Sequence, residues 1–272
     1  FYASSAEDRQ KIARILEKVS GNYSSRVQAG CMPIRYDAMS FSITIEFPPM
    51  KLEHLAQNWT VRKPLARSKG GIVATQNRIA GEAGVRILNA GGNAVDAAVA
   101  VGYALAVVNP CCGNIGGGGF MMIHLARQKK SVAIDYREMA SSLTTRNVFL
   151  DGRGEFEPEK SQSSGLGVGV PGTVAGFALA LEKYGSGKFA FGDLIGPAIP
   201  LARDGIEVDA DLADSLPFAV SRLGKYPSSR SIFLRADGGP LRRGDRLVQK
   251  DLAETLAIIA RDGPRGFYEG EI

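Results

Sequence analysis

Residues 91–122 read GGNAVDAAVAVGYALAVVNPCCGNIGGGGFMM, a run of small and apolar residues that ends in four glycines before Phe120. The helix predicted at residues 94–108 is apolar on nearly every side, whereas a solvent-facing helix has a single apolar stripe. We therefore expect this helix to lie inside the protein. The glycines lead into residues 120–125, an apolar run of strand length, so the backbone is expected to pass close to another segment there.

The segments around this stretch predict a helix before it and a hairpin after it. Residues 76–89 have apolar residues at helical spacing and end at Gly91 and Gly92, and Asn93 is suited to cap the buried helix. A hairpin is expected from strands at residues 120–126 and 131–136, joined by a polar loop. Arg137 and Glu138 then stand at its exit.

The rest of the chain is predicted to be mostly helical. Residues 151–165 are polar and contain glycine, as is typical of a surface loop, and residues 242–245 predict a turn before a short strand at 247–248. Further helices are expected at residues 6–19, 174–183, 194–203, 210–223 and 251–261. This order of elements favours a sheet covered by helices.

Composition restricts the class of protein. A chain of 272 residues with 44% hydrophobic content can form one large core or two ordinary domains. Its longest apolar run, residues 94–108, contains Asp96 and is shorter than the roughly 20 residues of a bilayer span. The net charge of +5 is scattered, which argues against nucleic-acid binding. The cysteines lack metal-ligand spacing and are expected to be free thiols: Cys31, Cys111 and Cys112.

Gly116 to Gly119 have the glycine content of a phosphate-binding loop. Both nucleotide-binding fingerprints require a strand, then glycines, then a helix. Here a helix precedes the glycines and a strand follows them, and no Lys-Ser/Thr pair is present. A tight turn where two backbones pack closely is therefore the favoured interpretation.

Other catalytic motifs are absent from the sequence. The only histidines are His54 and His124, and the chain contains no HExxH, CxxC or GxSxG motif, so zincin, thioredoxin and esterase chemistry are disfavoured and no cofactor or metal is predicted. Arg137 stands out because a guanidinium beside a glycine-lined turn is suited to bidentate capture of a carboxylate. An ordinary surface arginine is the alternative.

Six segments occur in a fixed order from about Val61 to the end of the chain. They read KGGIVATQNRIAGEAGVRILNAGGNAVDAAVAVGYALAVVNP, GNIGGGGFMMI, AIDYREMA, VGVPGTVAGFALALEKYG, PAIPLARDGIEV and LRRGDRLVQKDLAETLAIIARDGPRGFYEG. In this order they resemble the large subunit of γ-glutamyltranspeptidases (glutathione hydrolases). The resemblance implies an α+β fold of the N-terminal nucleophile hydrolase type, a four-layer αββα sandwich of which only the large-subunit part is present. Residues 1–57 would be an extension of unknown role and residues 58–272 an incomplete large-subunit region.

The resemblance also implies an activity and a partner. Such enzymes are made as precursors that cleave themselves, and the nucleophile is the N-terminal threonine of the small subunit, whose α-amino group is the general base. Glutathione or another γ-glutamyl compound would form a γ-glutamyl-enzyme, with transfer to water or to amino-acid or peptide acceptors. Arg137, within YREM, matches the family arginine that holds the α-carboxylate of the donor. The threonine is expected beyond Ile272, so this chain alone is expected to be inactive.

Ser141 replaces a proline usual in the family, a change expected to alter the turn behind Arg137. A truncated non-catalytic paralogue, or a partner-binding fragment, is one alternative, and a cephalosporin or glutaryl acylase of the same fold is another. The resemblance implies a periplasmic or extracellular location, although no signal peptide is visible after Phe1.

Overall fold

The computed structural model describes residues 34–36, 43–45 and 67–272. The chain divides into two units, Phe1–Leu65 and Ala66–Ile272. In the first unit, β1 (Ile34–Tyr36) and β2 (Ile43–Ile45) form an antiparallel pair. The helix expected at residues 6–19 lies outside the described residues, and the domain boundary predicted after residue 57 stays a prediction.

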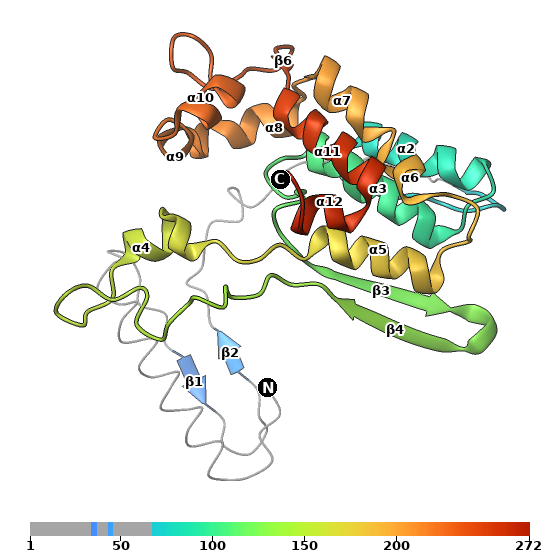
Figure 1. The fold of residues 1–272 in the computed structure, drawn as a ribbon, viewed down its shortest axis with the longest axis horizontal. Helices are drawn as coiled ribbons and strands as arrows, with labels where there is room; N and C mark the ends of the chain where they lie inside the picture. The colour runs from blue at the N-terminus through green and yellow to red at the C-terminus, as the bar shows by residue number, and fades with distance from the viewer. Residues whose placement is uncertain (1–33, 37–42, 46–66) are drawn as a thin grey trace. The chain divides into compact units, whose positions relative to one another are not determined.

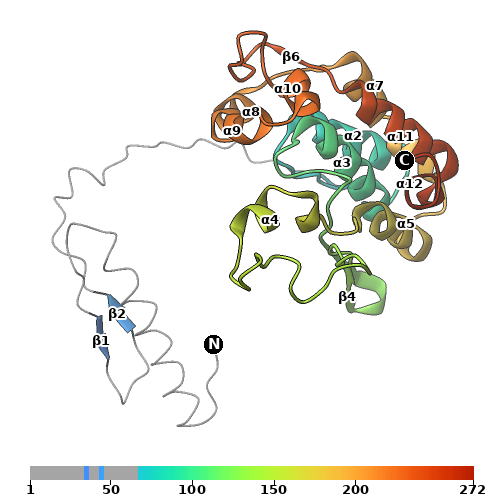
Figure 2. The ribbon, with the colours of Figure 1, turned by 60° about the vertical axis from the view of Figure 1, so that its left-hand side comes forward.

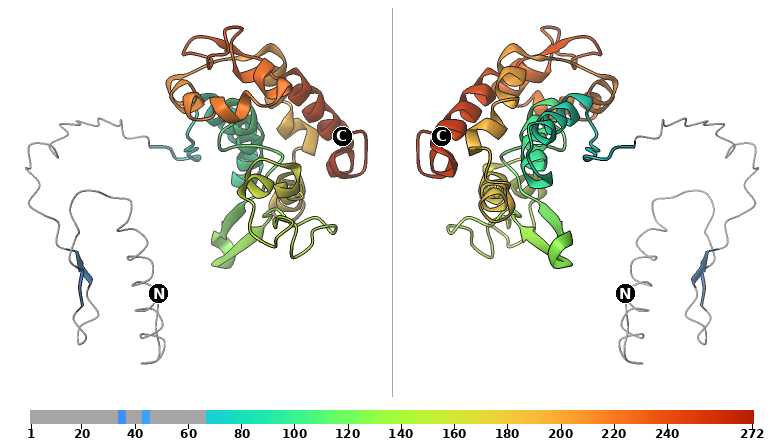
Figure 3. Two further views of the ribbon diagram at one scale, coloured as in Figure 1. Left: turned by 90° about the vertical axis from the view of Figure 1, so that its left-hand side faces the viewer. Right: turned by 90° about the vertical axis from the view of Figure 1, so that its right-hand side faces the viewer.

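The second unit is built on two helices, α2 (Arg78–Asn89) and α3 (Ala94–Val108), followed by a hairpin of β3 (Phe120–Leu125) and β4 (Lys130–Asp135). The helices that follow are α4 (Pro158–Gln162), α5 (Thr173–Tyr184), α6 (Phe191–Ile195), α7 (Ala198–Asp204), α8 (Ala210–Ser215), α9 (Val220–Leu223), α10 (Pro227–Phe233), α11 (Lys250–Asp262) and α12 (Pro264–Tyr268). Two short strands, β5 (Ile206–Glu207) and β6 (Arg246–Leu247), pair antiparallel and come before and after the α8–α10 segment in the chain. In Figures 1 and 3 the green hairpin and the orange α8–α10 segment lie at opposite ends of this unit.

Helix α3 forms the centre of the core. Asn93 accepts hydrogen bonds from the first turn, and the Asp96 carboxylate accepts one from the Asn93 N–H at 2.8 Å, which completes a capping box. Asp96 is only 1% exposed, and it also accepts a hydrogen bond from the Ser186 N–H at 3.1 Å. Because buried carboxylates require such partners, Asp96 fixes the start of α3 against the loop that follows α5.

The hairpin packs on α5 through one face. Its antiparallel register places Phe120 opposite Asp135 and His124 opposite Ser131. Ile134 on the inner face packs with residues of α3 and α5 in a small buried cluster. Phe120 and Met122, on the other face, are 61% and 71% exposed. Figure 2 shows β4 beyond α5, on the side away from α2 and α11. The predicted sheet is therefore covered by helices on one side within the described residues.

Local sequence signals predicted the long elements correctly. The buried helix, its Asn93 cap, the hairpin, and the helices at 174–183 and 251–261 are confirmed. The buried helix differs in one respect, because a stripe that includes Ala98 and Val101 is not buried. No helix among the described residues is long and apolar enough to cross a membrane.

Three helix and loop predictions were wrong at prolines and glycines. The helix expected at 194–203 is divided into α6 and α7 at Gly196 and Pro197, and the one expected at 210–223 is broken near Pro217. Proline lacks the N–H that a continuous helix requires. The loop expected at 151–165 contains helix α4, and helices α10 and α12 were not predicted either. All three helices have a proline in the first turn, where the missing N–H is tolerated.

Candidate functional site

Arg137 lies where the hairpin ladder ends and a second backbone pairing begins. The Tyr136 N–H donates to the Gly119 carbonyl at 3.0 Å, which extends the ladder one residue beyond β4. Two residues past Arg137, Met139 and Val170 exchange hydrogen bonds of 3.2 and 2.7 Å in an isolated antiparallel bridge. The backbone of Arg137 is thus held on both sides.

The glycine run allows this backbone to be approached closely. A Cβ on Gly118 would lie 2.9 Å from both Arg137 Cα and Glu138 N, and a Cβ on Gly172 would lie 2.8 Å from the Tyr136 carbonyl carbon. None of the four glycines at 116–119 has a positive φ. Gly118 and Gly172 are therefore needed because space is lacking, not because of an unusual backbone conformation.

The same run closes the N-terminus of α5. The Gly117 carbonyl accepts hydrogen bonds from Gly172 N at 2.8 Å, Thr173 N at 3.1 Å and Thr173 Oγ1 at 3.0 Å. An anion at a helix N-terminus would bind those same donors. Since a backbone carbonyl already occupies them, the structure supports the tight-packing interpretation over the phosphate loop.

The Arg137 side chain extends from this rigid frame into solvent. It is 63% exposed, its Nε donates to Glu138 Oε2 at 3.1 Å, and its Cζ lies 6.0 Å from the centre of the Phe120 ring. The Glu138 carboxyl accepts hydrogen bonds from the backbone N–H of Glu138 and from the Arg137 guanidinium, and these lower its pKa. Within the described part of the chain, the two terminal nitrogens of the guanidinium have no hydrogen-bond partner. They are free to take a carboxylate in the bidentate manner.

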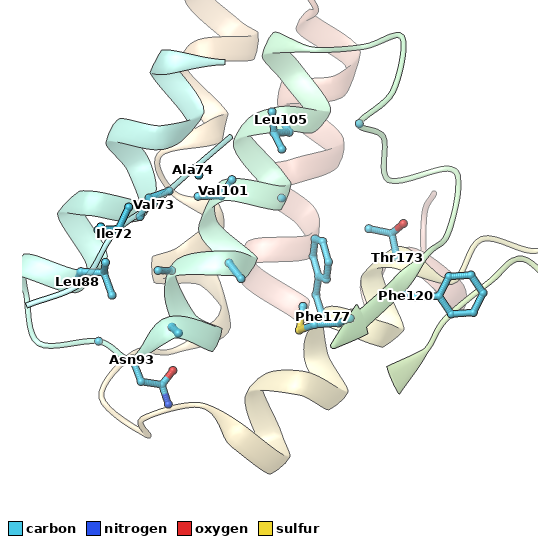
Figure 4. Close-up of a pocket in the computed structure, with 18 of the residues that line it drawn as sticks. Ile72, Val73, Ala74, Leu88, Asn93, Val101, Leu105, Phe120, Thr173 and Phe177 are labelled. Carbon is cyan, nitrogen blue, oxygen red and sulfur yellow. The ribbon is translucent and has the colours of Figure 1, made fainter. Parts of the chain in front are cut away.

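An apolar groove of about 670 Å³ lies next to this frame. Ile72, Val73 and Ala74 form one wall, as Figure 4 shows, while Phe120 and Thr173 lie across α3 on the other side. Arg137 does not line the groove. Its floor is formed by small and apolar residues of α3, of which Ala97 is buried and the others are not: Ala94, Ala97, Ala98, Val101, Gly102 and Leu105. This groove was not predicted from the sequence, although small residues at helical spacing on a buried helix indicate where another segment can approach it.

The other residues considered from the sequence do not gather at Arg137. His124 lies on the exposed face of the hairpin, with Nδ1 3.0 Å from Ser131 Oγ. Cys111 and Cys112 are exposed free thiols, as predicted, whereas His54 and Cys31 lie outside the described residues. In the part of the chain that the structure describes, no three His, Cys, Asp or Glu side chains are grouped so that they could hold a metal.

Tyr268 contributes to the frame from a distant part of the sequence. Its hydroxyl donates to the Pro171 carbonyl at 2.7 Å and accepts from the Ala175 N–H at 3.2 Å. The N-cap of α5 is Gly172, which has no side chain to bind those groups, so Tyr268 takes that role. Its partners are more than 90 residues away, and no local pattern indicated the contact.

Comparisons with known proteins point to one family. The family model described as gamma-glutamyltranspeptidase matches residues 80–272. A glutathione hydrolase proenzyme of Escherichia coli (strain K12) is 50% identical over 207 residues, 76% of this chain and 35% of that protein. The crystal structure of Helicobacter pylori gamma-glutamyltranspeptidase is similar with a TM-score of 0.73 at 46% identity, covering 76% of this chain and 59% of that one. For cephalosporin acylase from Bacillus halodurans the TM-score is 0.66 at 27% identity, covering 78% and 39%.

The chain therefore belongs to the γ-glutamyltranspeptidase family. Its fold class is the α+β, N-terminal nucleophile hydrolase type that the sequence resemblance implied. The chain spans about a third of the length of the curated relatives it matches.

Proposed function

We propose that this chain is the large-subunit portion of a γ-glutamyltransferase/glutathione hydrolase. The observation that carries the proposal is Arg137, whose backbone is fixed by the hairpin ladder and the glycine run while its guanidinium ends stay free. In this role Arg137 holds the α-carboxylate of glutathione or another γ-glutamyl donor. Because the Arg137 backbone is fixed and the ion pair with the carboxylate is bidentate, the γ-carbonyl of the donor is held at a defined distance from Arg137.

The nucleophile in this proposal is a threonine supplied from outside residues 1–272. Its hydroxyl oxygen would attack the γ-carbonyl carbon while the threonine's own α-amino group takes the hydroxyl proton. The amide C–N bond then breaks, the amine of the donor leaves with that proton, and the γ-glutamyl-enzyme ester remains. Water or an amino-acid or peptide acceptor attacks this ester, and the threonine hydroxyl is released. The buried Thr173 is unsuited to this role, because its Oγ1 donates to the Gly117 carbonyl. This chain alone is then inactive.

A small subunit from the same precursor is the proposed partner. The apolar groove beside α3 and the outer face of the hairpin are open in the described part of the chain. Contiguous exposed apolar surface of this kind is typical of a protein interface. Large exposed side chains in and near this region are Ile72, Phe120, Met122, Met139, Val168 and Val170. We also propose a periplasmic or extracellular location, on the family resemblance alone.

The direct test is to co-express the chain with a small-subunit segment and to measure turnover of γ-glutamyl-p-nitroanilide. Co-elution of the two polypeptides on size exclusion establishes assembly, and turnover by the assembled pair, with none by either part, is the expected result. Absence of turnover in a pair shown to be assembled would contradict the enzymatic proposal and favour a non-catalytic, partner-binding role. Faster turnover of a glutaryl amide than of glutathione would favour the acylase alternative.

Arg137 is tested in the same assembled pair. Loss of a charge-assisted bidentate contact costs on the order of 1.5–3 kcal/mol, so Arg137→Ala should raise the KM for γ-glutamyl donors roughly 10- to 150-fold. Arg127→Ala is the matched control, since Arg127 is an exposed arginine in the turn at the opposite end of the hairpin. An unchanged KM in Arg137→Ala would remove this residue from the site.

A further inference from the structure

Two adjacent thiols lie in the turn between α3 and the glycine run. Cys111 and Cys112 are both exposed and free, and their Sγ atoms are 3.1 Å apart. The turn itself is fixed by hydrogen bonds from the N–H groups of Cys112 and Gly113 to the Asn109 carbonyl, at 3.1 and 2.8 Å. The two sulfurs are therefore presented together by an ordered backbone.

A side-chain network orients both thiols. Asn109 Nδ2 donates to Gln76 Oε1 at 2.8 Å, which directs the amide oxygen of Asn109 toward Cys111. The Cys111 S–H donates to that oxygen at 3.0 Å. Since this hydrogen is used, the Cys111 sulfur is the acceptor for the S–H of Cys112. Both sulfurs are thus arranged on one side of the turn before a ligand binds, which lowers the entropic cost of binding.

The separation of the sulfurs selects the kind of atom that can bridge them. At bond lengths of about 2.3 Å, sulfurs 3.1 Å apart subtend an angle of about 85° at a shared atom. That angle is close to the right angle of a pyramidal three-coordinate centre and well below the tetrahedral angle that Zn²⁺ prefers. Within the described residues no third protein ligand completes a metal site. The geometry therefore suits a soft centre that brings its own third substituent.

We propose that Cys111 and Cys112 form a dithiol site for trivalent organoarsenicals. With a compound R–As=O, each thiol gives up its hydrogen, two S–As bonds form, and the arsenic–oxygen bond breaks with release of one water. Arsenic remains trivalent, so no oxidant or reductant takes part. The substituent R lies in a groove of about 380 Å³ that both cysteines line together with apolar Val108 and Leu212 and with five polar residues, namely Gln76, Asn77, Asn109, Asp209 and Asp211.

Disulfide formation is less suited to the same pair. Neighbouring Cα atoms across a trans peptide are about 3.8 Å apart, whereas disulfides usually span about 4.4–6.8 Å. Closing the bond would also pull the Sγ atoms from 3.1 Å to about 2.05 Å, whereas an arsenic bridge needs no such movement. The site is thus a chelator of soft electrophiles in preference to a redox couple.

The experiment uses the whole reduced chain and phenylarsine oxide as the probe. Intact-mass spectrometry should show one phenylarsenic group gained and two hydrogens lost, with the modification on the peptide that carries Cys111 and Cys112. The adduct should resist excess monothiol and be removed by 2,3-dimercaptopropanol. Cys111→Ser and Cys112→Ser should each weaken binding at least about 100-fold, because a chelate becomes a single bond. Cys31→Ser is the matched control and should bind like the wild type.

Any of four results would overturn the proposal. The first two are wild-type protein with titratable thiols that takes up no phenylarsenic and an adduct that monothiol removes. The other two are loss of binding in Cys31→Ser and equal binding by Cys111→Ser. The monothiol and dithiol comparison is made on the wild type, so the conclusion does not depend on the folding of any variant.

Discussion

Gly118→Ala is expected to disturb the backbone that carries Arg137. The new Cβ would overlap the Tyr136 carbonyl oxygen and would also lie 2.9 Å from Arg137 Cα and Glu138 N. Since ordinary contact begins at about 3.4 Å, the two segments must move apart by at least about 0.5 Å. These neighbours are backbone atoms in paired segments and cannot rotate away. Such overpacking costs roughly 1–3 kcal/mol, and a unit of this size loses roughly 2–4 °C of Tm per kcal/mol.

Gly116→Ala is the matched control within the same glycine run. Its Cβ would meet only Asn114 Oδ1, at 3.8 Å, and Gly116 has no positive φ, so this variant should be as stable as the wild type. Urea and thermal unfolding of both variants measure the difference, and in the assembled enzyme Gly118→Ala should also raise the KM for γ-glutamyl donors more than it lowers kcat. Equal stability of the two variants, within about 0.5 kcal/mol, would refute the close-approach explanation of the glycines.

Three further predictions concern side chains outside the glycine run. Asp96→Ala removes a buried cap and leaves the Ser186 N–H without its acceptor, so urea unfolding should show a loss of about 2–4 kcal/mol. Burial and the hydrogen bond with the neighbouring thiol raise the pKa of Cys111 to about 11. Since the thiolate is the reactive form, the rate of Cys111 alkylation by iodoacetamide, followed by peptide mapping, should rise about tenfold per pH unit from pH 8 to 10. A flat profile would contradict this. Tyr268→Phe takes one partner from the Ala175 N–H and should lower stability by about 0.5–1.5 kcal/mol with the secondary structure unchanged by circular dichroism.

The parts of the fold that were predicted correctly are those whose signals are local. A helix that is apolar on most sides, with Asn93 before it, indicates burial and a capped start within 20 residues of sequence. The hairpin was predicted for the same reason, from two apolar runs around a polar loop. The breaks in these two helices were not predicted, because apolar spacing continues across Pro197 and Pro217. A proline inside a helical pattern nevertheless indicates a probable helix boundary.

The candidate site, like the fold, was predicted only where its sequence signals are local. Sequence placed Arg137 at the exit of the hairpin, since that depends only on where the second strand ends. The contacts that hold it there join residues far apart in the chain, as when the Gly117 carbonyl binds Thr173 and the Tyr268 hydroxyl binds Pro171. Such pairs leave no periodicity in a single sequence, so they become visible only in the folded chain.

The glycines show why residue type alone underdetermines a site. A glycine with a positive φ can be recognised from the turn that surrounds it, because the requirement lies in its own backbone. Gly118 and Gly172 meet a different requirement, set by the Tyr136–Glu138 backbone that passes against both of them. Four glycines in a row are therefore compatible with an anion-binding loop or with a close crossing of chains. The choice depends on what occupies the helix N-terminus beside them, and here it is the carbonyl of Gly117.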